Sequence, residues 1–201
     1  MSGFDKKSEF EQGGSQPVIA TIASGFERNG KDAARRHIKL LAGDANARMH
    51  FSLVHQLDHT APIRNLDGPL DAHWDTIVTA GHRGYAAYVV VNEGGRTEGT
   101  IRRIRALFLE GRSVPLPTVW HRQPSFVVLG DQTQWCAYWK VKAFPAENFK
   151  PAQARLAGLY DMEARPNTLS RAMPLAGTRW TIDATHAEEI ALVEWLQRQQ
   201  K

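Results

Sequence analysis

The side chains best suited to chemistry include three closely spaced histidines. His55 and His59 are four residues apart, as in zinc proteases, but Gln56 stands where that motif needs a glutamate. His50 adds no other recognisable metal-binding spacing. We therefore expect surface or capping roles for these histidines rather than metal binding.

The single cysteine, Cys136, offers less chemistry than its rarity suggests. With one cysteine the chain forms neither an internal disulfide nor a cysteine-rich zinc site. Cys136 lies inside a predicted strand, where an unreactive buried thiol is expected. The sequence also lacks the Walker A, dinucleotide-binding and nucleophile-elbow motifs.

Arginines crowd around one predicted strand, and within residues 96–112 only Glu98 and Glu110 oppose them. They could form a solvated strand face or a groove for nucleic-acid phosphates, in which each contact adds salt-dependent affinity. Nearby aromatic residues could stack bases, although such residues usually pack in a core. The arginines are Arg96, Arg102, Arg103, Arg105 and Arg112, and the aromatic residues are Trp120, Trp135 and Tyr138.

The composition is that of a folded globular chain. Of 201 residues, 42% are hydrophobic and 23% charged, which excludes a mostly disordered, collagen-like or coiled-coil chain. A net charge of +4 permits nucleic-acid binding without requiring it. No apolar run is as long as a membrane span, and the N-terminus lacks the apolar core of a signal peptide. We therefore expect a cytoplasmic protein without a membrane partner.

The chain is expected to consist of a polar tail over residues 1–16 and one domain over residues 17–201. Helices are predicted wherever apolar residues recur at helical spacing between capping or stop signals. These helices cover about residues 32–43, 69–81, 151–159 and 185–201, the last with a capping-box pattern at Thr185 and Glu188.

Strands are predicted between these helices, where β-branched and aromatic residues dominate. They cover about residues 49–53, 85–92, 101–110, 125–129 and 135–141, the last two as a hairpin. In residues 101–110, Ile104, Ala106 and Phe108 form an apolar face that continues to Glu110, with Arg103 and Arg105 opposite. The pattern favours an α/β or α+β fold with mostly antiparallel strands.

Several short segments, each weak alone, occur in a familiar order over about residues 32–180. This order resembles the RepB-like primase domains of plasmids and other mobile elements, in the archaeo-eukaryotic primase superfamily. The segments are VVVNEGGR (89–96), IRRIRALFLEG (101–111), SVPLP (113–117), PSFVVL (124–129), WCAYWKV (135–141), NFKPAQ (148–153) and TLSRAMPLAGT (168–178).

The resemblance implies an α+β fold in which an RRM-like, mostly antiparallel sheet packs against helices. It also implies metal-dependent nucleotidyl transfer. In the family an Asp-x-Asp pair and a later Asp hold Mg²⁺ or Mn²⁺, which prefer clustered carboxylate ligands. A histidine before a Tyr-Trp pair helps to bind the triphosphate of the incoming nucleotide.

This sequence departs from the family at each of these catalytic positions. In an ungapped alignment Glu110 and Arg112 replace the Asp pair; with a two-residue deletion Glu110 replaces the second Asp and the first is missing. Either way Glu110 is the one carboxylate left as a metal ligand there, although Asp131 or Glu163 could substitute. The other departures are Cys136 for His, Thr168 for the later Asp, Pro174 for Arg and Ala176 for Pro, while Arg171 and Gly177 are kept.

Three hypotheses follow. The leading one is a catalytically impaired primase-like domain that serves the replication or maintenance of a mobile element. It would bind single-stranded or template DNA, and an arginine in a former metal site could still hold a phosphate. The alternatives are an active divergent primase-polymerase that uses Mg²⁺ or Mn²⁺, and a protein-binding inhibitor or regulator on the same fold. Nucleotides and other replication proteins are further expected partners. The expected phosphate-binding residues are Arg96, Arg103, Arg105, Arg112, Lys140 and Arg171.

Overall fold

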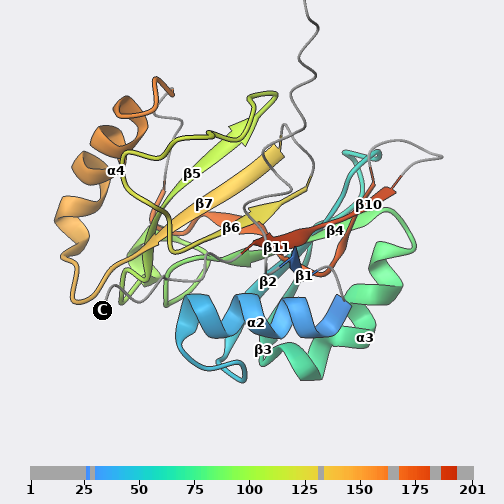
Figure 1. The fold of residues 1–201 in the computed structure, drawn as a ribbon. Coiled ribbons are helices and arrows are strands. Elements are labelled where there is room, and N and C mark those ends of the chain that lie inside the picture. Colours follow the sequence, from blue (N-terminus) through green and yellow to red (C-terminus); the bar gives the residue numbers. More distant parts are fainter. Residues whose placement is uncertain (1–25, 28–29, 131–133, 163–167, 182–186, 194–201) are drawn as a thin grey trace, which may run out of the picture.

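The computed structural model describes residues 26–27, 30–130, 134–162, 168–181 and 187–193. The expected polar tail over residues 1–16 lies outside these residues. The described part contains three α-helices and two larger antiparallel sheets (Figure 1). The expected α+β class with mostly antiparallel strands is confirmed.

The larger sheet has five strands in the order β1-β11-β6-β7-β5. Every neighbouring pair in it is antiparallel. β6 and β7 form the predicted hairpin, and β5 lies at the sheet edge. The strands are β1 (Phe26–Glu27), β5 (Ala106–Arg112), β6 (Phe126–Leu129), β7 (Gln134–Lys140) and β11 (Ala191–Val193).

The second sheet has four strands in the order β3-β2-β4-β8, also antiparallel throughout. Its strands are β2 (Met49–His55), β3 (Arg64–Gly68), β4 (Tyr85–Val90) and β8 (Ala172–Pro174). A short ribbon of β9 (Arg179–Thr181) and β10 (Ala187–Glu189) adjoins it, because β9 contacts β4. β8 brings a late segment of the chain against β4, and this pairing helps to build the candidate site.

The helices cover the sheets from two sides. α2 (Gly30–Ala42) and α3 (Leu70–Gly81) lie together on one side, and α4 (Phe149–Gly158) lies on another side, against β5 (Figure 1). α2 buries the predicted stripe of Ala34, Ile38 and Leu41. Two 3₁₀ turns, η1 (Glu98–Thr100) and η2 (Ala146–Asn148), complete the described elements.

Alternation along β7 divides the core into two clusters. Cys136 and Tyr138 face the larger cluster, which lies between the two sheets and includes α2. Trp135, Ala137 and Trp139 face a second cluster with residues of α4. This division follows from the period of two along a strand. Burial of both faces makes β7 a central element of the fold.

Gln153 of α4 closes the free edge of β5. Its side-chain amide accepts a hydrogen bond from the Phe108 N–H and donates one to the Phe108 carbonyl, both at 3.0 Å. Gln153 and Phe108 are both fully buried. An edge strand needs such partners because its unpaired backbone groups would otherwise be buried unsatisfied or open to another chain.

The predicted helix at the C-terminus is wrong over its described part. Residues 187–189 and 191–193 form β10 and β11, while Thr185 and residues 194–201 lie outside the described residues. Ile190 and Leu192 pack in the first core cluster, and Ala191 and Val193 pack in the second. A strand buried on both faces is a continuous apolar run, so short sequence patterns do not separate it from a helix.

The strand predicted over residues 101–110 begins only at Ala106. Before it, the N–H groups of Arg102 and Arg103 both donate to the Glu93 carbonyl, and the Arg105 N–H donates to Asn92 Oδ1. The loop after β4 therefore holds residues 102–105, and the side chain of Arg105 is buried rather than on a solvent face. β3 was not predicted, because its sequence RNLDG has little β propensity.

We expect Gln153→Leu to lower the free energy of unfolding by about 3 kcal/mol. The substitution removes both partners of the buried Phe108 backbone groups, and each unsatisfied group costs about 1–3 kcal/mol. Urea unfolding followed by circular dichroism measures the change. Arg155→Leu, at an exposed position of the same helix, is the control and should shift stability by only about 0.5 kcal/mol. Equal effects of the two variants would contradict this role of Gln153.

Acid should destabilise the fold through His37, which is fully buried on α2. Burial lowers the pKa of His37 from 6.5 to about 3. The His37 side chain therefore binds a proton below about pH 6.5 in the unfolded chain, but only below about pH 3 in the folded chain. The free energy of unfolding falls as the pH drops between these values, because the proton favours the unfolded state. Between pH 5 and 4, His37 should contribute a slope of about 1.4 kcal/mol per pH unit.

Urea unfolding of His37→Asn over this range tests the assignment. Asparagine can still accept the hydrogen bond that Ala176 N–H donates to His37 Nδ1 at 3.2 Å. The slope should become shallower in His37→Asn, whereas the exposed control His59→Asn should keep the wild-type slope. An unchanged slope in His37→Asn would show that another group causes the acid sensitivity.

Candidate functional site

Glu110 is the centre of the candidate site. It lies near the end of β5, opposite Cys136 of β7 in the strand register. Its side chain is 12% exposed. Glu110 continues the core-facing positions Ala106 and Phe108, as the period of two predicts. The strand thus delivers a carboxylate to the rim of the core between the two sheets.

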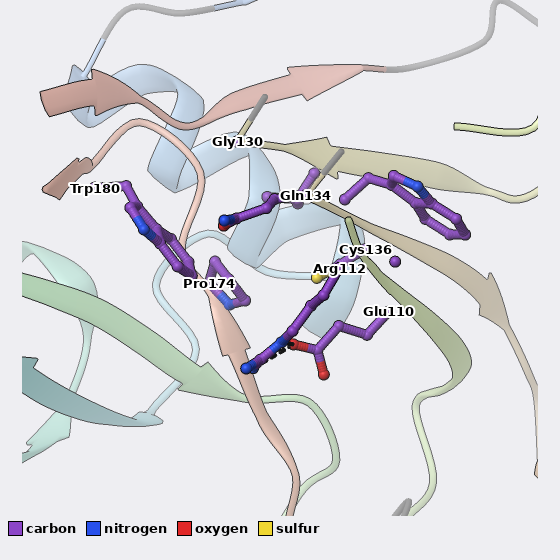
Figure 2. Close-up of a pocket in the computed structure, with 10 residues that line it drawn as sticks. Glu110, Arg112, Gly130, Gln134, Cys136, Pro174 and Trp180 are labelled. Atoms are coloured by element: carbon purple, nitrogen blue, oxygen red, sulfur yellow. Dashed lines mark hydrogen bonds and ion pairs between the residues drawn. The ribbon is translucent and has the colours of Figure 1, made fainter. Parts of the chain in front are cut away.

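Two arginines bind the two oxygens of this carboxylate. Arg112 donates from Nε and Nη2 to Glu110 Oε1 at 2.6 Å, an interaction drawn in Figure 2. Arg171 donates from Nη2 to Glu110 Oε2 in a short hydrogen bond. Charge-assisted hydrogen bonds of this type are the stronger ones in proteins. Both oxygens of Glu110 therefore have cationic partners.

These contacts set the ionisation of the site. Burial alone would raise the pKa of Glu110, but Arg171 and Arg112 outweigh it and hold that pKa below its ordinary value. Cys136 lies beside this carboxylate, and burial raises the pKa of its thiol well above 9. At neutral pH the site therefore contains an ionised carboxylate, two guanidinium groups and a protonated thiol.

Arg171 reaches Glu110 through the pairing of β8 with β4. Its carbonyl accepts a hydrogen bond from Val91 N–H at 3.0 Å, and its own N–H donates to the Thr168 carbonyl at 3.1 Å. Thr168 thus begins a turn whose last residue binds Glu110. The structure brings together Glu110, Arg112, Cys136 and Arg171, and it places Thr168 in the turn that positions Arg171.

The cavity beside these residues is small. It holds about 20 Å³, enough for about one water molecule. Gln134 and Gly130 line it from the hairpin, and Pro174 and Trp180 line it from β8 and β9 (Figure 2). Pockets for small molecules usually occupy several hundred Å³. Sequence reasoning did not identify Trp180 as a lining residue, because no local signal shows that β9 packs here.

Gly111, between Glu110 and Arg112, is required by close packing. A Cβ at this position would overlap the indole ring of Trp135, the residue opposite it in β7. The Trp135 Nε1–H donates to the Val114 carbonyl at 2.9 Å, which fixes the ring. Gly111 therefore lets β5 pack closely against the Trp135 ring between Glu110 and Arg112.

Arg96, another expected phosphate contact, braces the second sheet instead. Its Nη2 donates to the carbonyls of Phe51 and Leu66 at 2.8 and 2.9 Å, and lies 2.6 Å from Asp67 Oδ1. The hydrogen bond from Arg96 is the main cause that lowers the pKa of Asp67 to about 2, and His50 lowers it further. The guanidinium of Arg96 thus links β2 to β3, and the structure does not bring it together with Glu110.

The remaining expected cations gather at the opposite end of β5. Arg103, Arg105 and Lys140 line a cleft of about 170 Å³ with Lys142, which sequence reasoning did not single out. Arg105 and Glu110 are five residues apart along the chain, a span of about 17 Å in an extended strand. The expected phosphate-binding residues therefore lie in two separate places, at Glu110 and at this cleft, while Arg96 links strands of the second sheet.

The histidines and aromatic residues have structural contacts. His50 Nδ1 lies 2.7 Å from Asp67 Oδ1, and His55 Nδ1 accepts the N–H of Asp58 at 2.9 Å. Trp135 and Tyr138 are buried, and Trp120 packs against Trp135. Within the described ranges, no three His, Cys, Asp or Glu side chains are placed to share a metal ion.

None of the described helices is long and apolar enough to cross a membrane. No protein-family model and no curated protein sequence matches the chain. Solved structures do match it.

The primase-polymerase of cyanophage S-2L, in its AEP domain, is 20% identical, with a TM-score of 0.66 over 85% of this chain and 92% of that domain. A structure of the primase RepB′ is 16% identical, with a TM-score of 0.62 over 82% of this chain and 56% of that one. The RepB′ catalytic domain in complex with initiator DNA is 17% identical, with a TM-score of 0.62 over 84% of this chain and 86% of that domain.

The match to these three structures covers 82–85% of this chain. At 16–20% identity it concerns the fold alone. The chain has the RepB-like fold of the archaeo-eukaryotic primases.

Proposed function

We propose that this protein is a primase-like DNA-binding domain that serves the replication or maintenance of a mobile element and has lost metal-dependent nucleotidyl transfer. The observation that carries the proposal is the double engagement of Glu110 by Arg112 and Arg171. The fold supplies the nucleic-acid context, and the site supplies the argument against catalysis.

The fold neighbours support the DNA-binding part. One of them is a primase catalytic domain in complex with initiator DNA, and another is a primase-polymerase domain from a cyanophage. The exposed lysines Lys140 and Lys142 support it too, because among the described residues neither has an ion-pair partner. Unpaired surface cations are available to phosphates, whose neutralisation dominates nucleic-acid affinity.

The residues at Glu110 do not fit the Mg²⁺ or Mn²⁺ ions that the family resemblance implies. Hard divalent cations need several oxygen ligands with negative charge. Here one carboxylate is present among the described residues near the site, and both of its oxygens are bound by guanidinium groups. A protonated thiol at Cys136 is a poor ligand for such ions. Asp131 and Glu163 lie outside the described residues.

The cavity also argues against a bound nucleoside triphosphate beside Glu110. Its volume of about 20 Å³ matches a water molecule, and Pro174 and Trp180 form part of its wall. The two arginines already neutralise the carboxylate, so no metal ion is needed to balance its charge. We infer that the ion pairs replace the metals as the cationic partners of Glu110.

Templated nucleotide incorporation tests the catalytic part. We expect no extension or de novo product on single-stranded DNA with Mg²⁺ or Mn²⁺, for wild type and for Glu110→Ala alike. A primase of known activity in the same buffer is the positive control, and circular dichroism verifies that both samples are folded. Products from wild type that disappear in Glu110→Ala would instead establish an active, divergent primase-polymerase.

Fluorescence anisotropy with a labelled single-stranded oligonucleotide tests the binding part. The logarithm of the affinity should fall linearly with the logarithm of salt concentration. Lys140→Ala with Lys142→Ala should weaken binding and reduce the slope by about 1.4, at about 0.7 for each lost phosphate contact. Lys150→Ala, whose lysine pairs with Glu98 at 3.3 Å, should change the slope little.

Glu110→Ala should leave DNA affinity nearly unchanged in the same assay, because it removes no cation. Absence of any salt-sensitive DNA binding by folded wild-type protein would contradict the proposal. A protein-binding regulator on a primase fold would then be the better explanation.

A further inference from the structure

The cleft at the start of β5 contains a buried arginine with few partners. The Arg105 side chain is 7% exposed and lines the cleft of about 170 Å³. Its backbone is fixed on both sides, since its N–H donates to Asn92 Oδ1 and its carbonyl accepts from Val141 N–H. The guanidinium group is therefore held in place by the fold rather than by its own contacts.

The contacts of this guanidinium group are weak. Nη1 donates to the sulfur of Met49 at 3.4 Å, and a thioether is a poor acceptor. Nη2 lies 3.7 Å from Glu93 Oε2, which is too far for a hydrogen bond. Nε has no partner among the described residues. A buried charged donor without acceptors is costly, so a native fold rarely keeps one without a ligand or ion.

Glu93 does not satisfy Arg105, because another arginine already binds it. Arg103 Nη2 lies 2.5 Å from the same Oε2 atom of Glu93. One carboxylate is thus shared between two guanidinium groups, and the closer one is the exposed Arg103. The cleft retains an excess of positive charge after this pairing is counted.

Exposed cations surround the mouth of the cleft. Lys140 and Lys142 come from the end of β7 and the residues after it, and Arg103 comes from the segment before β5. The opposite wall is Leu41 to Gly43 at the end of α2, which supplies no charged side chain. On this wall the negative end of the helix dipole opposes the cations only weakly.

We propose that this cleft is a site for a phosphoryl group of a nucleic acid or nucleotide, with Arg105 as its buried ligand. An arginine fork matches the oxygens of phosphate, and the unsatisfied Nε–H and Nη–H groups are its donors. At about 170 Å³, the cleft has room for several water molecules, or for a phosphoryl group with part of its hydration.

This site is distinct from the one at Glu110. About 17 Å of extended strand separates Arg105 from Glu110, and the two cavities share no lining residue. The inference rests on the proposed function, since it specifies where a phosphoryl group would be bound. It adds that one phosphoryl group is recognised in a buried position rather than by surface charge alone.

Titration with inorganic phosphate, followed by the ¹H–¹⁵N NMR signal of the Arg105 side chain, is the direct test. The Nε–H resonance should shift saturably with phosphate, and Arg105→Gln should weaken phosphate binding about tenfold or more. Arg83→Gln removes an equal charge from an exposed position beyond α3 and should leave it unchanged. An unresponsive Arg105 signal in wild type, or equal weakening by both variants, would overturn the proposal.

Competition against phosphate identifies the source of the group. A short 5′-hydroxyl oligonucleotide should compete if internal strand phosphates occupy the site, whereas only the 5′-phosphorylated form and adenosine monophosphate should compete if a terminal phosphate does. Competition by none of them would overturn the assignment to nucleic acid or nucleotide.

If phosphate binds at Arg105 but the protein does not bind DNA, the proposed function fails separately. Where the 5′-hydroxyl oligonucleotide competes, wild-type DNA affinity in Arg105→Gln would overturn the inference while leaving the proposed function intact.

Discussion

The ion pair between the largely buried carboxylate of Glu110 and the guanidinium group of Arg171 links the two sheets of this protein. Glu110 comes from the edge strand of the five-stranded sheet, and Arg171 comes from the residue just before the edge strand of the four-stranded sheet. Breaking such a pair would leave a charge at the rim of the core without its partner, which is strongly destabilising. In the function that we propose, the same charges take the place of a divalent cation, so the interaction that joins the sheets also determines what the site can do.

The fold separates two tasks that cations perform along a single strand. At one end of β5, Arg112 and Arg171 bind the two carboxylate oxygens of Glu110. In the proposed function, neither oxygen is therefore free to bind a metal. At the other end, Arg105 is buried beside exposed lysines with only a distant carboxylate. In the first arrangement both guanidinium groups are bonded to a carboxylate, whereas in the second most of the cations have no bonded carboxylate among the described residues. The second end therefore has the larger excess of positive charge, and it is the end that we propose as the phosphate site.

The sequence predicted the elements whose patterns are local, and it failed where tertiary contacts decide. The sequence shows clear patterns for several elements, namely α2, α3, β2, β4 and the hairpin of β6 and β7. On β7, Cys136 and Trp135 lie on opposite faces, as the alternation along a strand requires. The strand β11 looked helical because both of its faces are buried. Arg105 looked exposed because only the loop around Asn92 and Glu93 turns it inward. The meeting of Glu110 with Arg171, 61 residues later, depends on the pairing of β8 with β4, for which no short-range signal exists.

Direct measurement of metal binding tests most sharply whether the arginines have taken the place of the metal ions. Electron paramagnetic resonance of Mn²⁺, titrated with wild-type protein and with Glu110→Gln, counts free ions without relying on catalysis. The charge arrangement at Glu110 predicts that both proteins leave the free Mn²⁺ signal nearly unchanged and indistinguishable from each other. Stoichiometric loss of the free signal with wild type, abolished in Glu110→Gln, would contradict it and show that Glu110 releases its arginines to hold a metal.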